Sequence, residues 1–185
     1  MITTRARAGL LILAFAAMLS MDARAVLAAS AADINRDATA ALNKLYADVP
    51  EARALAAKAR AILIFPRVVK AGFMFGAQYG DGVLRRQGKA VGYYNTIAAS
   101  YGFQAGIQEF GYVLLFMNDS ALAYLDKTDG FEIGVGPSIV VLDAGKAKAL
   151  TTTTMQNDIY AFIFGQRGLM AGMGLQGTKI TRIAK

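Results

Sequence analysis

The sequence contains no cysteine, no histidine and no tryptophan among its 185 residues. Without cysteine the chain has no disulfide, no thiol nucleophile and no thiolate metal site. Without histidine it lacks the commonest general base and the commonest transition-metal ligand. The serines, carboxylates and lysines that are present form no recognisable catalytic motif. The sequence therefore predicts that the protein is not an enzyme, with no catalytic residue, no metal site and no cofactor.

Long apolar runs are also scarce, and the one that matters lies near the N-terminus. Arg5 and Arg7 precede the apolar segment Leu10–Leu19, and the small-residue pattern Ala23–Ala25 follows it. This order is typical of a signal peptide covering residues 1–25, although cleavage within Ala28–Ala32 fits as well. A membrane anchor is disfavoured because a spanning helix needs about 20 apolar residues. We therefore expect an exported protein that is periplasmic or secreted.

Removal of residues 1–25 leaves 160 residues, of which 17 are basic and 12 are acidic, a net charge of +5. This length suffices for one domain with a sizeable core. We expect that domain to consist of a helical segment over 26–60 and a β-rich core over 61–185.

Hydrophobic periodicity changes from helical to strand-like near residue 61. Residues 30–61 have an apolar stripe at three- and four-residue spacing, and Pro50 should divide them into two helices. From Ile62 onward apolar and polar residues alternate, with turns expected at Asp81-Gly82 and at 87–89. Residues 119–127 break the strand pattern, and 146–156 fit a strand or a loop. The fold class predicted is α+β, with N-terminal helices packed on a strongly curled, mostly antiparallel sheet or barrel.

A short glycine motif occurs four times and points to the same curled sheet. The four copies are GFMFG (72–76), GFQAG (102–106), GFEIG (130–134) and GLMAG (168–172). Glycine weakens a flat strand, so its recurrence on strands indicates coiling, bulges or the close approach of another backbone. The alternative, a GxxxG motif of membrane helices, is disfavoured because no copy lies in an uninterrupted apolar 20-mer. Most aromatic residues, Phe75 among them, are expected in the core.

Basic residues are concentrated in one part of the chain. No acidic residue occurs from Ala52 to Gly80, so this stretch and the one that follows it should give a positive face. Each basic residue near an anionic membrane contributes roughly 1 kcal/mol, although charge clusters are also common on ordinary solvated surfaces. The candidate lipid-binding residues are Arg53, Lys58, Arg60, Lys70, Arg85 and Arg86.

Three strings of the sequence resemble the SYLF domain family. They are VVKAGFMFGAQYGDGVL (68–84), GVGP (134–137) and IYAFIFGQRGLMAGMGLQG (159–177), and the similarity extends over about residues 40–183. The resemblance implies binding of phospholipids, binding of actin filaments in some fungal members, and no catalytic activity. Family members usually carry an acidic residue in the final L-[ED]-G segment, whereas this chain has Gln176. Actin binding does not transfer to an exported bacterial protein, which would not meet actin in its own cell.

These observations together predict a non-enzymatic phospholipid-binding module of the bacterial envelope. It would be peripherally associated with the membrane and would dock on anionic lipid head groups through its basic face. The alternatives are a structural or adhesive envelope protein and a small outer-membrane β-barrel, although several strands look short for spanning a bilayer. Nucleic acid fits the pI of about 9.7, but export and the absence of a nucleic-acid-binding motif argue against it.

Overall fold

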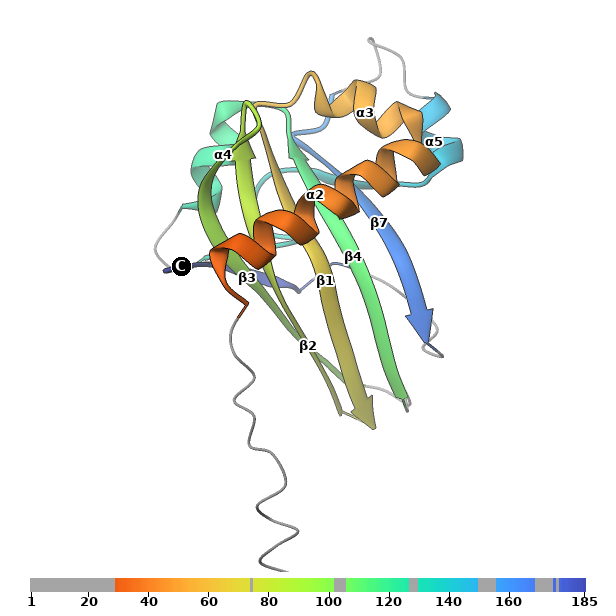
Figure 1. The fold of residues 1–185 in the computed structure, drawn as a ribbon, viewed down its shortest axis with the longest axis vertical. Coiled ribbons are helices and arrows are strands. Elements are labelled where there is room, and N and C mark those ends of the chain that lie inside the picture. The colour runs from red at the N-terminus through yellow and green to blue at the C-terminus, as the bar shows by residue number, and fades with distance from the viewer. Residues whose placement is uncertain are drawn as a thin grey trace, which may run out of the picture. The chain divides into compact units, whose positions relative to one another are not determined.

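Long antiparallel strands dominate the structure, and two helices precede them (Figure 1). The computed structural model describes residues 29–73, 75–101, 106–126, 130–149, 156–168, 175 and 177–185, so the segment expected to be a signal peptide lies outside the described residues. Ala31–Lys185 forms one unit. Its helices are α2 (Ala31–Asp48), α3 (Pro50–Ala56), α4 (Asp119–Leu125) and α5 (Ala144–Ala149). Its strands are β1 (Ala61–Phe73), β2 (Phe75–Arg86), β3 (Lys89–Tyr101), β4 (Gly106–Phe116), β5 (Phe131–Glu132), β6 (Ile139–Leu142), β7 (Ile159–Gly168) and β8 (Lys179–Ile183).

The helical segment is divided at Pro50, as the sequence predicts. Proline lacks an N–H and restricts the preceding residue, so α2 ends at Asp48 and Pro50 starts α3. The buried residues of α2 lie on one side of the helix at three- and four-residue spacing: Ile34, Ala38, Leu42 and Leu45. None of the helices in the described ranges has the length and apolarity needed to cross a membrane.

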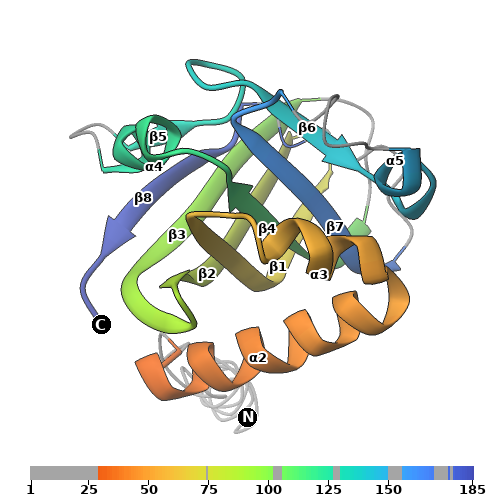
Figure 2. The same ribbon diagram turned by 90° about the horizontal axis from the view of Figure 1, so that it is seen from above.

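The eight strands form one sheet in the order β5-β8-β3-β2-β1-β4-β7-β6. Every neighbouring pair is antiparallel except β6 and β7, which are parallel. Figure 2 shows that the sheet curls into a half-barrel, with α2 and α3 on its convex side. This arrangement confirms the predicted α+β class and the curled, mostly antiparallel sheet.

The sheet buries apolar side chains on both faces. On the concave side, which we call the inner face, Leu63, Phe65 and Leu114 pack with residues of α4. On the convex side, the outer face, Ile64 and Val113 pack beneath α2 and α3. Because successive side chains of a strand point to opposite faces, neighbouring residues enter different cores. Helices cover only part of the outer face, so the rest of that face is exposed.

The predicted turn at Asp81-Gly82 is wrong, because both residues lie inside β2. The hairpin between β1 and β2 instead joins Phe73 to Phe75. Gly82 is needed for packing: a Cβ there would lie 2.5 Å from the carbonyl oxygen of Ile64. At this level β1 has a bulge, where the register shifts between Phe65 and Val68. Gly82 is therefore present because two backbones approach closely there. From the sequence alone, such a glycine cannot be distinguished from a turn glycine.

The glycine motifs serve the curled fold in different ways. Gly72 and Gly76 are cross-strand partners, and a Cβ on Gly72 would collide with the Cα of Gly76. Gly130 and Gly134 have φ values of +79° and +106°, so the strand predicted over residues 131–135 ends after two residues, as β5. Gly102 and Gly172 lie outside the described residues.

One further element differs from the strand or loop expected over 146–156. Residues 144–149 form helix α5, because the Asp143 carboxylate accepts a hydrogen bond from the Lys146 N–H at 2.8 Å. Such a bond satisfies an N–H group that the first turn of a helix leaves without a partner. Residues 150–155 lie outside the described residues.

Candidate functional site

Five of the six basic residues named from the sequence lie at one edge of the sheet. Arg53 and Lys58 belong to α3 and the turn after it, Arg60 precedes β1, and Arg85 and Arg86 end β2. The register aligns Arg85 with Ile62 at the start of β1, which brings the two chain segments together. We call these five residues the basic edge.

Lys70, the sixth candidate, does not belong to the basic edge. It lies eight residues beyond Ile62 along β1, which corresponds to about 25 Å at the rise of a β-strand. Its cross-strand partners are Gln78 and Gln108, and it shares the inner face with Val68. The charge of Lys70 is therefore presented on another face and at the opposite end of the sheet.

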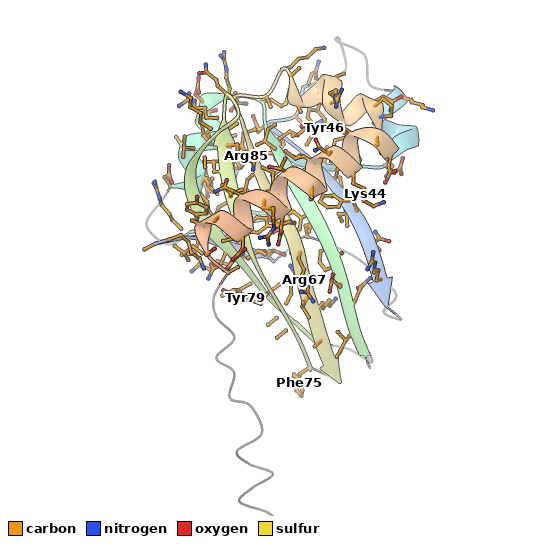
Figure 3. The ribbon with its side chains drawn as sticks, in the orientation of Figure 1. Lys44, Tyr46, Arg67, Phe75, Tyr79 and Arg85 are labelled. Carbon is orange, nitrogen blue, oxygen red and sulfur yellow. The ribbon has the colours of Figure 1, made fainter. Side chains whose placement is uncertain are left out.

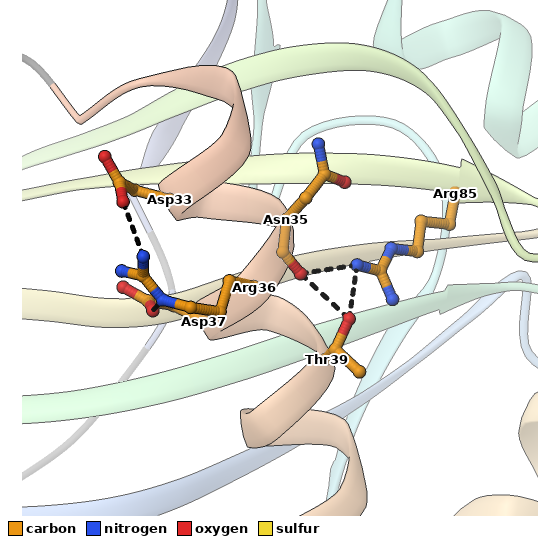
Figure 4. Close-up of polar contacts among 6 residues, drawn as sticks. All are labelled: Asp33, Asn35, Arg36, Asp37, Thr39 and Arg85. Atoms are coloured by element: carbon orange, nitrogen blue, oxygen red, sulfur yellow. Dashed lines mark hydrogen bonds and ion pairs between the residues drawn. The ribbon is translucent and has the colours of Figure 1, made fainter.

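Arg85 holds α2 against the sheet. Its Nη2 donates hydrogen bonds to the carbonyl oxygen of Asn35 at 2.7 Å and to the Thr39 hydroxyl at 2.8 Å (Figure 4). On the same helix Arg36 pairs with Asp33 at 2.7 Å and with Asp37 at 3.0 Å, which takes up most of its charge. Arg85 thus has a structural contact that a residue used only for ligand binding would lack.

The remaining members of the basic edge are exposed, and most have a partner. The Asp119 carboxylate forms ion pairs with Arg86 at 3.0 Å and with Arg60 at 3.9 Å. The Arg53 guanidinium lies 5.4 Å from the centre of the Tyr46 ring. Burial raises the pKa of Tyr46, and the charges of Arg53 and Arg85 oppose the rise. One carboxylate shared by two arginines leaves the basic edge positive, and exposed pairs of this kind are weak.

A second surface lies on the outer face beyond the part that α2 covers. Five large side chains are exposed there by 36–70%, and we call them the apolar patch: Val69, Phe75, Tyr79, Ile97 and Ile107. They are five of the eight large apolar side chains exposed in the described part of the chain. In Figure 3 Phe75 lies at the far end of the strands, while Arg67 and Tyr79 lie between it and α2.

The register makes the apolar patch continuous. Val69, Tyr79 and Ile97 are aligned cross-strand partners on three neighbouring strands. In the next row toward the strand ends, Ile107 is aligned with three exposed alanines, Ala71, Ala77 and Ala99. Contiguous apolar surfaces of more than a few hundred Å² mark interaction sites, whereas single exposed apolar residues are common.

Charged side chains flank the row of the patch that contains Val69, Tyr79 and Ile97. Glu109 is the partner of Val69 and is paired with Arg67 at 2.8 Å, and Arg167 is aligned with Glu109 on β7. On the other side Lys179 is aligned with Ile97. The patch is therefore apolar at the strand ends and is bordered nearer α2 by three cations and the Glu109 carboxylate.

Tyr79 joins the apolar and charged parts. Its hydroxyl donates a hydrogen bond to Asp81 at 2.7 Å, and this bond, together with burial, raises the pKa of Tyr79 to about 12. Asp81 also accepts from Lys185 at 2.9 Å, and these two side chains are 9% and 10% exposed. Tyr79 thus presents an exposed ring whose polar end is fixed.

The GVGP segment borders a hollow of about 290 Å³, lined in part by Pro137, Ser138 and Leu175. The Asp158 carboxylate fixes its wall by accepting from the Ser138 N–H at 2.8 Å and from Asn118 at 2.8 Å. These bonds lower the pKa of Asp158, the Ser138 N–H contributing most. A Cβ on Gly136 would lie 2.6 Å from the Tyr124 ring, so the glycine is needed for packing. The described residues contain no group of three or more acidic side chains suited to a metal ion.

Residues 97–184 match the family model described as "Ysc84: Las17-binding protein actin regulator", which is the SYLF domain. The chain belongs to the SYLF family. Its match begins near the end of β3 and continues through β8. A comparison with curated proteins finds no significant match. SYLF domains are binding modules rather than a catalytic family, and they are associated with lipid- and actin-related binding.

The SYLF match does not include the six basic candidates, because all of them precede residue 97. It does include two members of the apolar patch, Ile97 and Ile107. Sequence reasoning missed this patch, since it grouped Phe75 with the core aromatic residues whereas Phe75 is 70% exposed. One signal was present: near the hairpin, Lys70 and Gln78 alternate with apolar neighbours.

Proposed function

We propose that this SYLF domain is a non-enzymatic phospholipid-binding module that docks on anionic membranes of the bacterial envelope. The observation that carries the proposal is the apolar patch at the strand ends, bordered by cations. The lipid-related binding of the family supports the choice of ligand class.

The side chains of the apolar patch lie at successive distances from the strand ends, as expected of a surface that inserts into a membrane. Phe75 lies at the strand end, Ile107 shares the next row with three alanines, and the row that contains Tyr79 follows. Four residues separate Phe75 from Tyr79 on β2, about 13 Å at the rise of a strand. Peripheral elements bury their apolar faces by about 5–10 Å. Phe75 and Ile107 would thus enter the acyl region, while the row that contains Tyr79, together with Arg67 and Lys179, would lie among the head groups.

The energetics require both apolar and charged contributions. Burying a large apolar side chain contributes about 1.5–3 kcal/mol, so Phe75 and Ile107, which are 70% and 67% exposed, contribute about 2–4 kcal/mol together. Loss of translational and rotational freedom opposes this by about 4 kcal/mol or more. Cations near an anionic surface add roughly 1 kcal/mol each. Binding should therefore be weak on neutral vesicles and stronger on anionic ones.

The basic edge is a second candidate surface for the same function. Its exposed cations would attract anionic head groups, but among the described residues it has one large exposed apolar neighbour, Val91, against five in the apolar patch. Long-range attraction alone weakens with salt, because the Debye length falls from about 10 Å at 0.1 M to 3 Å at 1 M. Salt dependence and surface variants together separate the two candidates.

The test is co-sedimentation of the mature protein with neutral and with anionic phospholipid vesicles at low and high salt. The double variant Phe75→Ser, Ile107→Ser should lose most binding at both salt concentrations. Its control is Val135→Ser, Val141→Ser, which removes two exposed valines that belong to neither candidate surface. The variant Lys58→Glu, Arg86→Glu tests the basic edge; Arg85 is left intact because it holds α2.

Loss of binding in the Lys58/Arg86 variant, with full binding in the Phe75/Ile107 variant, would move the docking surface to the basic edge. An absence of binding by the parent protein to any vesicle would overturn the function and favour a structural envelope protein. Thermal melts of each variant must match the parent, which these exposed positions should permit.

A further inference from the structure

The inner face carries a row of polar side chains near the strand ends, on the reverse side of the apolar patch. Lys70 of β1 is aligned with Gln78 of β2 on one side and with Gln108 of β4 on the other. Side chains aligned in this way lie next to one another on one face. Upper parts of the same strands carry apolar side chains on this face, so the polar row interrupts the core.

Two members of this row are buried with unused hydrogen-bonding groups. Gln78 is 5% exposed and Gln108 is 4% exposed. The Nε2 atom of Gln78 and the Oε1 atom of Gln108 have no hydrogen-bond partner. Within the described residues the side chain of Lys70 makes no ion pair or hydrogen bond, although its backbone belongs to the ladder of β1. Buried polar groups are nearly always hydrogen-bonded, so two orphaned amides beside an ammonium group call for a partner.

The neighbouring rows differ in the size of their side chains on the two sides of the polar row. Toward the middle of the sheet, Val68 and Phe110 are buried in the inner core. Toward the strand ends the aligned residues are Gly72, Gly76 and Gly106, which have no side chains. None of these three glycines is fully buried. The polar row is therefore bounded by apolar packing on one side and by an accessible backbone surface on the other.

We propose that Lys70, Gln78 and Gln108 bind the phosphate group of a phosphate ester. The Lys70 ammonium supplies the charge, and the Gln78 amide donates to a phosphate oxygen. The Gln108 oxygen accepts from a hydroxyl of the phosphate or of the group attached to it. Assignment of oxygen and nitrogen in either amide can be reversed without loss, because each amide offers both a donor and an acceptor.

The phosphate could belong to a lipid or to a small soluble ester. The lipid is favoured because Val68 and Phe110 border the row with apolar surface, and this choice rests on the proposed function. The phosphate site itself does not depend on docking, since it faces away from the apolar patch and accepts one molecule at a time.

The test is calorimetry of the mature protein with three monomeric probes: inorganic phosphate, glycerol 3-phosphate, and dihexanoyl phosphatidic acid below its micelle concentration. Lys70→Met should weaken binding of every phosphate probe by roughly 10–100-fold, the effect of losing a charged hydrogen bond. Lys89→Met, at the exposed start of β3, is the matched control and should bind as the parent does.

The glutamine variants give a readout that a purely structural role would not produce. Gln78→Leu and Gln108→Leu should weaken binding several-fold yet raise the melting temperature by about 2–5 °C, because each removes an unpaired buried amide. Lower melting temperatures with unchanged binding would assign these glutamines to the fold and overturn the site. Equal binding by Lys70→Met and the parent would overturn it as well.

The probes also separate this site from vesicle docking. Tighter binding of dihexanoyl phosphatidic acid than of glycerol 3-phosphate supports a lipid, whereas equal binding overturns the lipid source and supports a soluble ester. An absence of binding by all three probes at millimolar concentration overturns the site. The variant Phe75→Ser, Ile107→Ser should keep monomer binding, so its loss of vesicle binding tests docking alone.

Discussion

Replacement of Gly82 by alanine should destabilise the protein by about 2–4 kcal/mol. The added Cβ would lie 2.5 Å from the Ile64 carbonyl oxygen and 2.5 Å from Cδ1 of Phe65, which is fully buried. Ordinary contacts between such atoms are about 3.5–4.0 Å, so β1 and β2 must separate by about 1 Å. Gly82 does not have a positive φ angle, so alanine causes no backbone strain there.

The magnitude follows from three contributions. Overpacking a filled site costs about 1–3 kcal/mol, and each ladder hydrogen bond weakened by the separation costs about 0.5–1.5 kcal/mol. Alanine recovers about 0.4–1 kcal/mol by restricting the unfolded chain. For a domain whose total stability is about 5–15 kcal/mol, the net loss is easily measured.

The assay is equilibrium urea denaturation of the protein, followed by far-ultraviolet circular dichroism. Gly80→Ala should act in the same direction, because its Cβ would lie 2.7 Å from the Arg67 carbonyl oxygen. Gly177→Ala is the matched control: its Cβ would meet no atom within 4 Å, so only left-handed strain of roughly 1–2 kcal/mol applies. A smaller loss for Gly82→Ala than for Gly177→Ala would refute the close-approach argument.

Two further predictions concern single side chains. Arg85→Met should lower the free energy of unfolding by about 1–2 kcal/mol, because the hydrogen bonds of Arg85 to α2 are lost. Arg86→Met breaks only an exposed ion pair and should change the free energy of unfolding by less than about 0.5 kcal/mol. Equal effects of the two variants in urea denaturation would contradict the assigned roles. Since the folded-state pKa of Tyr79 is raised from 10 to about 12, its contribution to stability is complete below pH 10 and is lost as the pH rises through 12. An absorbance titration at 295 nm should show one fewer phenol ionising near pH 12 in Tyr79→Phe, and identical curves would contradict the raised pKa.

Local sequence signals predicted the elements that depend on local physics. Proline at position 50 divides the helices in any tertiary context, because its missing N–H and its clash with the preceding residue are properties of the chain itself. Alternating apolar residues likewise predicted strands from residue 61 onward. The recurring glycines predicted a curled sheet, which the half-barrel confirms.

Predictions that depended on distant contacts were less successful. Asp81-Gly82 has the composition of a turn, yet Gly82 lies within β2 because the backbone of β1 passes close to it. The acid-free stretch suggested one positive face, but Lys70 lies about 25 Å from the other candidates along β1. The sequence shows which residues are basic, whereas the direction and register of the strands decide which basic residues lie close together.

The sequence by itself determined which residue types the protein lacks, where its helices break and which residues alternate along its strands. Only the tertiary structure decided which face of each strand is covered. Val83 and Tyr79 lie on the same face of β2, four residues apart, yet α2 covers Val83 while Tyr79 is 52% exposed. The physical reason is that a side chain is buried only where another element covers it, and α2 crosses the strands obliquely, so it covers only part of their length (Figure 1).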